Sequence, residues 1–384
     1  MSKRGGMIAA GLMSGSSLDG VDFVVVKFEE GALNSFVPKN PSGPHFDWML
    51  TDTRPYPKQL TEALSKADQV SHLEYLKLEH KFSKHLGKYI RELTNSLPEK
   101  HRPEVVGVHG HTVFHRVVDG FSIQMGSGSV IAHESGLPVG VDFRNAAIAA
   151  GGEGAPMAPA ANALFTGKYS AFLNLGGIAN VSFFQDDTFT TFDICACNQL
   201  LNHFAEKAGH PFDKNGKMAS EGNLIPDLLE TLSSVDYLKE LPPKSLSNQQ
   251  VKSWFIQPAE SHRVEPKDGL HTSSQHIAQE IYHSFKSALG NRLKKGDSRF
   301  FVTGGGAKNK YLMDLISKKL EDLDVVTECA DDTLLDFKEA LLMARMAALR
   351  WRGLPNFAGP FPGNPGGVVG GALYLPPNGA SDGK

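Results

Sequence analysis

Residues 11–22 read Gly-Leu-Met-Ser-Gly-Ser-Ser-Leu-Asp-Gly-Val-Asp and lie between two apolar segments. The segment before them, 7–13, and the β-branched segment after them, 21–26, have the composition of strands, whereas the stretch between has that of a turn. The pattern predicts a β-hairpin with a polar tip. Glycines in the tip permit positive φ and close backbone approach, and successive N–H groups in such a turn bind anions. An ordinary glycine- and serine-rich turn is the alternative.

The tip supplies a candidate phosphate site. Its two carboxylates, Asp19 and Asp22, are groups that hold hydrated Mg²⁺, and we take them as the candidate metal ligands. The residues expected to contact the phosphates of a nucleotide are Gly15, Ser16, Ser17, Leu18, Asp19, Gly20 and Asp22.

Two later segments repeat the plan of an apolar strand followed by glycines. Residues 171–183 contain two strand-like runs around Gly176 and Gly177, and residues 300–310 run into the triple glycine 304–306. Three glycines leave no Cβ above the backbone, so a flat ring or a ribose can lie on it. No Walker A loop and no G-x-G-x-x-G after a strand occurs. One glycine hairpin in each half therefore predicts a nucleotide held between two related lobes.

Composition limits the classes of protein to consider. The chain has 384 residues, a formal net charge of −3 and three cysteines. This length predicts two domains, and the charge provides no electrostatic footprint for nucleic acid or an anionic membrane. No transmembrane-length apolar run or signal peptide is evident, and three cysteines make no disulfide framework. We expect a soluble protein of the reducing cytoplasm.

Strand-like and helical runs alternate, which predicts an α/β fold with mostly buried sheets. The best candidate for a domain boundary lies near residue 142. Helices are expected over 73–93, 273–289 with Thr272 as N-cap, 311–320 and 336–351 with Asp336 as N-cap. Short strands are expected at 105–109, 121–125, 138–142, 188–193 and 325–328, and surface loops at 29–56 and 354–368.

Several polar residues are candidates for chemistry. Asp193 ends an expected strand. A carboxylate at that place in an α/β sheet points into the crevice where ligands bind and can act as a general base. The alternative is that Asp193 caps the next helix. Arg144 is a candidate anion ligand or a surface ion-pair partner, and Glu153, between glycines, contacts ligand or solvent. His109 and His111 fall on one face if the strand continues through them, which fits hydrogen bonds to a sugar better than a metal site.

Together these motifs resemble the anhydro-N-acetylmuramic acid kinase family, within the sugar-kinase/Hsp70/actin superfamily. The resemblance covers nearly the whole chain. The matching stretches are Gly11–Asp22 with Ser16 in place of threonine, His109–Thr112, Asp142–Met157, Leu173–Asn180, Phe192–Asp193, Phe212–Gly216, Pro243–Ser245, Gly304–Gly306 with Asn309, and Lys338–Ala340.

The resemblance implies an actin-like ATPase fold, with two ribonuclease-H-like domains around a nucleotide cleft. It implies that ATP and Mg²⁺ are used, that 1,6-anhydro-N-acetylmuramic acid is opened by water and phosphorylated on O6, and that Asp193 activates the water. A homodimer is also implied. The expected domains are residues 1–141 with about 368–384, and 142–367. The implied ATP ligands of the second domain are Asn174, Gly176, Gly177, Asn180, Gly304, Gly305, Gly306 and Asn309; the implied sugar ligands are His109, His111, Thr112, Arg144, Glu153 and Asn198.

The sequence departs from the family pattern on the expected sugar side. Ala147 stands where the family has an aspartate, and Glu153 where it has a glutamine. A carboxylate at 153 repels an anionic lactyl group, so a shifted sugar preference is an open alternative. A superfamily ATPase without sugar transfer, and a glycoside or metal-dependent hydrolase built on Asp193, Glu153 and the histidines, are the other readings.

Overall fold

The computed structural model describes residues 6–14, 18, 20–38, 45–155, 157–185, 188–242, 244–289, 298–358, 361 and 366–377. Contacts divide the chain into two compact units. The first unit comprises residues 1–167 and 337–384, and the second comprises 168–336. Both combine sheets with helices, which confirms the predicted α/β class.

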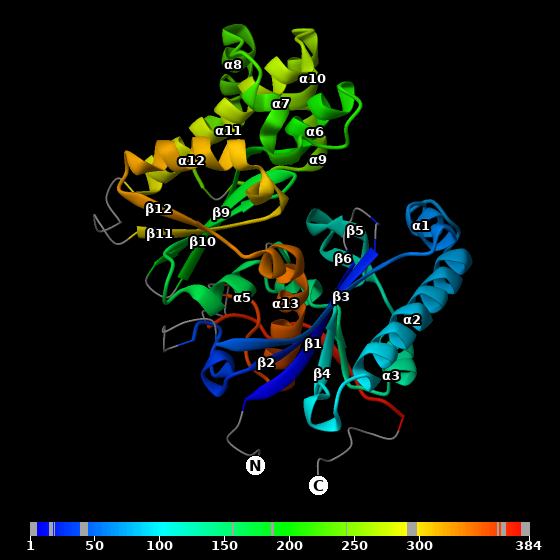
Figure 1. Cartoon of the computed structure of the whole chain (residues 1–384). Coiled ribbons are helices and arrows are strands. Elements are labelled where there is room, and N and C mark those ends of the chain that lie inside the picture. Colours follow the sequence, from blue (N-terminus) through cyan, green and yellow to red (C-terminus); the bar gives the residue numbers. More distant parts are fainter. Residues whose placement is uncertain are drawn as a thin grey trace. The chain divides into compact units, whose positions relative to one another are not determined.

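The first unit is built on a six-stranded sheet in the order β13-β7-β4-β1-β2-β3, beside a separate two-stranded sheet of β5 and β6 (Figure 1). Its strands are β1 (Met7–Ser14), β2 (Gly20–Phe28), β3 (Phe46–Pro55), β4 (Val105–Val108), β5 (His111–Arg116), β6 (Phe121–Met125), β7 (Val139–Val141) and β13 (Ala372–Tyr374). Its helices are α1 (Lys58–Leu64), α2 (His72–Asn95), α3 (Gly128–Ser135), α4 (Arg144–Ala149), α5 (Pro159–Asn162) and, from residue 337 on, α13 (Asp332–Trp351).

The second unit has a five-stranded sheet in the order β10-β9-β8-β11-β12. Its strands are β8 (Ala171–Leu175), β9 (Ile178–Gln185), β10 (Thr188–Ala196), β11 (Ser298–Thr303) and β12 (Val325–Cys329). Its helices are α6 (Asn198–Lys207), α7 (Lys217–Ser220), α8 (Pro226–Ser233), α9 (Asn248–Val251), α10 (Gln257–Ser261), α11 (Pro266–Leu289) and α12 (Lys310–Glu321). Figure 1 shows α11 and α12 side by side.

The two sheets share one topology. In each, an antiparallel meander of three strands is followed by two strands parallel to the first, as β3-β2-β1-β4-β7 and as β10-β9-β8-β11-β12. Parallel strands require crossover connections, which the helices between them provide. This repeated order is that of a ribonuclease-H-like domain, so the expected pair of such domains is confirmed.

Glycines in the first sheet let a helix approach closely. Gly11 of β1 and Gly107 of β4 are register partners. A Cβ on Gly11 would lie 1.9 Å from the Ala340 carbonyl oxygen, and one on Gly107 would lie 2.1 Å from that of Met343. Helix α13 therefore packs with its backbone against the sheet, while the opposite face, with Leu12, packs against α2 and α3.

The limits of the units differ from the expected boundaries at 142 and 368. Residues 142–167 and most of α13 belong to the compact first unit. Their contacts explain this, because α13 lies directly on Gly11 and Gly107, and Arg345 of α13 donates to the Ala160 carbonyl.

Most predicted elements are present, with local corrections. The expected loop 29–56 is wrong in part, because β3 pairs along β2 and completes the meander. Thr272 is not an N-cap: it lies inside α11 and accepts a hydrogen bond from the Ile225 N–H. Asp336 also lies inside its helix, and Asp331 accepts from the Leu334 N–H instead. Helix α2 begins with a capping box between Ser71 and Glu74.

Candidate functional site

The first glycine hairpin forms as predicted, with β1 and β2 antiparallel from Met7–Phe28 to Ser14–Val21. Gly15, Ser16, Ser17 and Asp19 lie outside the described residues. The positive φ of the described tip falls on Leu18, at 56°, and the Thr61 hydroxyl donates to its carbonyl over 3.4 Å. Gly20 allows β2 to lie close to the Arg54 backbone of β3, because a Cβ there would lie 2.5 Å from the Arg54 carbonyl oxygen.

Asp22 leaves this hairpin on β2, opposite Met13 on one side and Thr53 on the other. The Thr53 hydroxyl donates to Asp22 Oδ1 over 2.6 Å. Glu339 of α13 interacts electrostatically with both Asp22 and Arg144. Two carboxylates with a nearby hydroxyl are oxygen donors that suit Mg²⁺. Glu339 is a candidate that the residue patterns did not reveal, although it lies in a family-like stretch.

In the second unit, strand register aligns four polar residues across adjacent strands. Asp193 of β10 lies opposite Asn180 of β9, which lies opposite Asn174 of β8, which lies opposite Thr303 of β11. Directly opposed residues of a sheet point to the same face. The predicted residues Asp193, Asn180 and Asn174 therefore form one polar row. Thr303, which the sequence patterns did not single out, completes it.

Asp193 occupies a bulged position rather than a helix cap. The pairing of β10 with β9 shifts between Asp193 and Cys195, and helix α6 begins only at Asn198. The Leu246 N–H donates to Asp193 Oδ2 over 2.8 Å, which favours the charged form of the carboxylate and fixes its direction. β-Bulges commonly re-aim a side chain next to an active site.

The glycines of the second unit converge beside this row. The carbonyls of Gly176 and Gly177 accept hydrogen bonds from the N–H groups that start α6, and the Asn198 amide donates to the Leu175 carbonyl over 2.9 Å. A Cβ on Gly304 would lie 2.7 Å from Asn174 Oδ1, and one on Gly306 would lie 3.1 Å from Asn198 Oδ1. The structure thus brings the second hairpin, Asn198 and the triple glycine 304–306 into one glycine-lined surface.

Asn309 has a structural task. Its Oδ1 accepts the Leu312 N–H over 3.1 Å and caps α12. It also lies against Gly216, where a Cβ would come within 2.3 Å of the Asn309 Oδ1. The nucleotide contact predicted for Asn309 stays a prediction.

His109 and Arg144 form a defined pair in the first unit. His109 Nδ1 lies 2.9 Å from the Gly110 carbonyl, so it carries the proton, and Nε2 accepts from Arg144 Nη2 at 3.0 Å and Nε at 3.2 Å. Burial, together with the neighbouring guanidinium, lowers the pKa of His109 to about 3. Arg144 Nη1 also donates to the Gly154 carbonyl over 3.0 Å. A neutral imidazole therefore holds a charged guanidinium in place.

Of the other predicted sugar ligands, His111, Thr112 and Glu153 belong to the same unit as this pair, whereas Asn198 lies beside the glycines of the second unit. The prediction that His109 and His111 share a strand face is wrong, because β4 ends at Val108 and His111 begins β5 of the separate two-stranded sheet. Gly110 between them has φ of 76°. Thr112 follows on β5, and the exposed Glu153 lies near enough to His115 to interact with it electrostatically.

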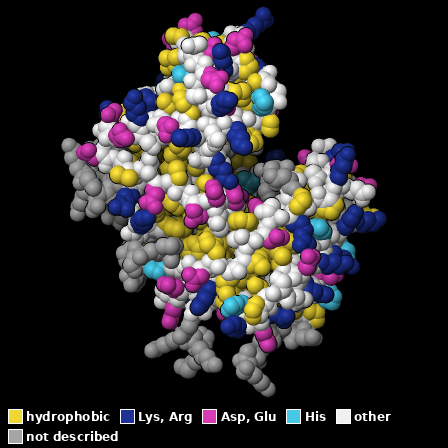
Figure 2. Space-filling model, viewed as in Figure 1, with side chains coloured by type: hydrophobic (Ala, Val, Ile, Leu, Met, Phe, Trp, Pro, Cys, Tyr) yellow, Lys and Arg dark blue, Asp and Glu magenta, His cyan; other side chains and the backbone are white. Residues whose placement is uncertain are grey.

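Among the described residues, no group of three or more His, Cys, Asp or Glu residues is arranged to hold a metal ion, and no helix has the length and apolar character that a membrane span needs. On the face that Figure 2 presents, basic and acidic side chains are interspersed.

Comparison with known proteins identifies the family. The family model described as anhydro-N-acetylmuramic acid kinase matches residues 7–376. A protein of that name from Aliivibrio fischeri is 30% identical over 356 residues, covering 90% of this chain and 93% of its own. Another from Nitrobacter winogradskyi is 29% identical over 387 residues, covering 96% of this chain and 100% of its own.

Among solved structures, a ROK family glucokinase from Streptomyces griseus in complex with glucose and AMPPNP is 12% identical, with a TM-score of 0.40, and covers 88% of this chain and 99% of its own. The family match spans both units and every described element of the candidate site. The chain therefore belongs to the anhydro-N-acetylmuramic acid kinase family.

Proposed function

We propose that the protein is an ATP-dependent kinase that opens 1,6-anhydro-N-acetylmuramic acid with water and phosphorylates O6, giving N-acetylmuramic acid 6-phosphate and ADP in cell-wall recycling. Family membership supports the reaction. The observation that carries the chemistry is the row of Asp193, Asn180, Asn174 and Thr303 beside the glycine-lined surface. A carboxylate in the same row as Asn174, whose Oδ1 lies close to Gly304, supports a base near the proposed nucleotide site.

Asp193 is the proposed general base. Its carboxylate takes a proton from water as the water oxygen attacks the anomeric carbon and the bond from that carbon to O6 breaks. O6 then attacks the γ-phosphorus, and ADP leaves. Phosphoryl transfer depends chiefly on positioning and on stabilising charge, which backbone N–H groups of the glycine turns supply.

Arg144 and His109 are the proposed sugar ligands. Arg144 is held by the His109 ring and the Gly154 carbonyl, so little side-chain entropy remains to be lost when a polar substrate binds. We propose that Asp22, with Asp19, holds Mg²⁺. A bound Mg²⁺ neutralises charge on the phosphate oxygens. The homodimer and the cytoplasmic location stay predictions.

The test is ADP release with ATP and Mg²⁺, with and without 1,6-anhydro-N-acetylmuramic acid. We expect sugar-dependent ADP and a sugar product heavier by one water and one phosphoryl group in mass spectrometry. In Asp193→Asn, kcat should fall by about 10²–10⁴-fold because the general base is lost. The affinity for ATP should stay within about twofold.

Asp236→Asn is the matched control, because Asp236 is an exposed carboxylate of the same unit that pairs with Lys239. Unchanged turnover in Asp193→Asn would refute the assigned base. ATP binding without sugar-dependent ADP would point to another acceptor, as the charge of Glu153 suggests, or to an ATPase.

A further inference from the structure

The backbone and carboxylate of Asp193 are both held by one segment of the second unit, of which residues 237–242 and 244–246 are described. The Asp193 N–H donates to the Lys244 carbonyl over 3.2 Å, and the Leu246 N–H donates to Asp193 Oδ2 over 2.8 Å. The Tyr237 hydroxyl donates to the Asp193 carbonyl over 2.8 Å. The direction of the carboxylate therefore depends on the path of this segment.

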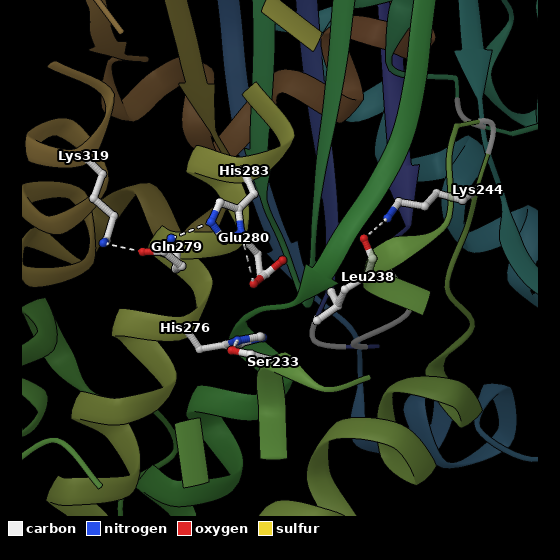
Figure 3. Close-up of polar contacts among 8 residues, drawn as sticks. All are labelled: Ser233, Leu238, Lys244, His276, Gln279, Glu280, His283 and Lys319. Atoms are coloured by element: carbon white, nitrogen blue, oxygen red, sulfur yellow. Dashed lines mark hydrogen bonds and ion pairs between the residues drawn. The ribbon is translucent and has the colours of Figure 1, made fainter. Parts of the chain in front are cut away.

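The side chain of Lys244 ties the two ends of that segment together. Its ammonium donates to the Leu238 carbonyl at 3.3 Å (Figure 3). It also donates to the Tyr237 carbonyl at 3.1 Å and lies 4.6 Å from the centre of the Tyr237 ring. Partial burial lowers the pKa of Lys244, while the charges of Glu240 and Glu280 oppose that shift. A cross-link of this kind removes freedom that the loop would otherwise have.

We propose that Lys244 is a positioning residue for the general base Asp193, because its ammonium closes the segment that holds the Asp193 backbone and carboxylate. The inference rests on the proposed function. Lys244 acts through the segment it closes: its own carbonyl and the Leu246 N–H set the backbone and the carboxylate of Asp193. Its ammonium touches no reacting group in this scheme.

The test replaces the ammonium with a methyl group of similar reach, in Lys244→Met. We expect kcat to fall about tenfold or more, with ATP affinity within about twofold, because only alignment of the base is lost. The acidic limb of the pH profile of kcat/KM should move to higher pH by about one unit, because a carboxylate that loses an N–H donor is protonated more easily.

Lys239→Met is the matched control, since Lys239 lies on the same segment but is exposed and pairs with Asp236. It should leave kcat and the pH profile unchanged. Equal effects of the two variants, or a joint loss of ATP affinity and thermal stability with an unmoved pH profile, would overturn the positioning role.

A second measurement does not depend on activity. Amide hydrogen exchange at Asp193 and Leu246 should speed up about tenfold or more in Lys244→Met, while the β1–β2 amides of the first unit stay protected. Unchanged exchange refutes the link even if turnover falls. If wild-type protein makes no sugar-dependent ADP but exchange responds, the reaction assignment fails and the link between Lys244 and Asp193 stands.

Should Lys244→Met fail to fold, Lys244→Gln offers a milder second variant. Its uncharged, shorter side chain cannot hold both the Tyr237 and Leu238 carbonyls, so we expect a shift of the acidic limb in the same direction with a smaller fall in kcat. A profile and kcat identical to wild type would overturn the role of Lys244.

Discussion

At the scale of single residues, close approach of backbone decides what each position tolerates. Gly107 lies beneath α13, where a Cβ would meet the Met343 carbonyl oxygen at 2.1 Å and the Ala347 side chain at 3.0 Å. Backbone atoms cannot yield as the end of a flexible side chain can. We expect Gly107→Ala to lower the free energy of unfolding by about 2–3 kcal/mol.

Urea denaturation measures this effect. Gly31→Ala is the control, because nothing lies within 4 Å of a Cβ at Gly31. That variant should leave stability unchanged or raise it by up to about 1 kcal/mol. Equal stabilities of the Gly107 variant and wild type would show that α13 can shift away from the sheet at low cost.

At the scale of elements, one buried cation joins α13 to two distant segments. Arg345 is fully buried and donates to the carbonyls of Ala32, Phe36 and Ala160; among the described residues its Nε has no partner. Burial lowers its pKa to about 9. In Arg345→Met these carbonyls would lose their hydrogen-bond donor, which lowers the free energy of unfolding by about 1–3 kcal/mol for each carbonyl. Removal of a buried charge raises the free energy of unfolding and so opposes this loss.

We expect the lost donors to dominate, so Arg345→Met should destabilise the protein by about 3 kcal/mol in urea denaturation. Arg352→Met is the control, since Arg352 makes only a 3.5 Å contact to the Leu33 carbonyl. It should cost less than about 1 kcal/mol. A more stable Arg345→Met would mean that desolvation of the guanidinium outweighs its hydrogen bonds to the four carbonyls of Ala32, Ser35, Phe36 and Ala160.

At the scale of the whole molecule, each unit contains a histidine that burial keeps neutral. Burial lowers the pKa of His109 in the first unit and of His276 in the second to about 3, from 6.5. The unfolded chain therefore binds protons that the folded chain does not, from about pH 6.5 down to about pH 3. Each histidine contributes stability above pH 6.5 that is lost as the pH falls through this window.

His276→Leu should therefore reduce the loss of unfolding free energy between pH 7 and pH 5 by about 2 kcal/mol. Denaturation curves at the two pH values measure this difference. His210→Leu, at an exposed position, should leave the difference as in wild type. If His276→Leu also leaves it unchanged, another group of the second unit carries the pH dependence.

Local patterns predicted much of the fold because their causes lie within a few residues. The glycine turns at 176–177, the apolar repeats of α2 and α12 and the β-branched strands were identifiable from spacing and composition. The cap predictions at Thr272 and Asp336 failed for a related reason. A cap is defined by where backbone pairing starts, and the helices extend further toward the N-terminus than their apolar patterns suggest.

The sequence by itself determined the family, the two glycine hairpins and Asp193 as the candidate base, since each depends on the order of residues in short stretches. Only the tertiary structure decided that Asp193, Asn180, Asn174 and Thr303 form one row, because register between strands depends on distant pairing. It also decided that Lys244 closes the segment holding Asp193 and that Arg345 joins three segments. The contacts of Leu246 with Asp193 and of Arg345 with Phe36 and Ala160 join residues far apart in the chain, where no spacing rule applies.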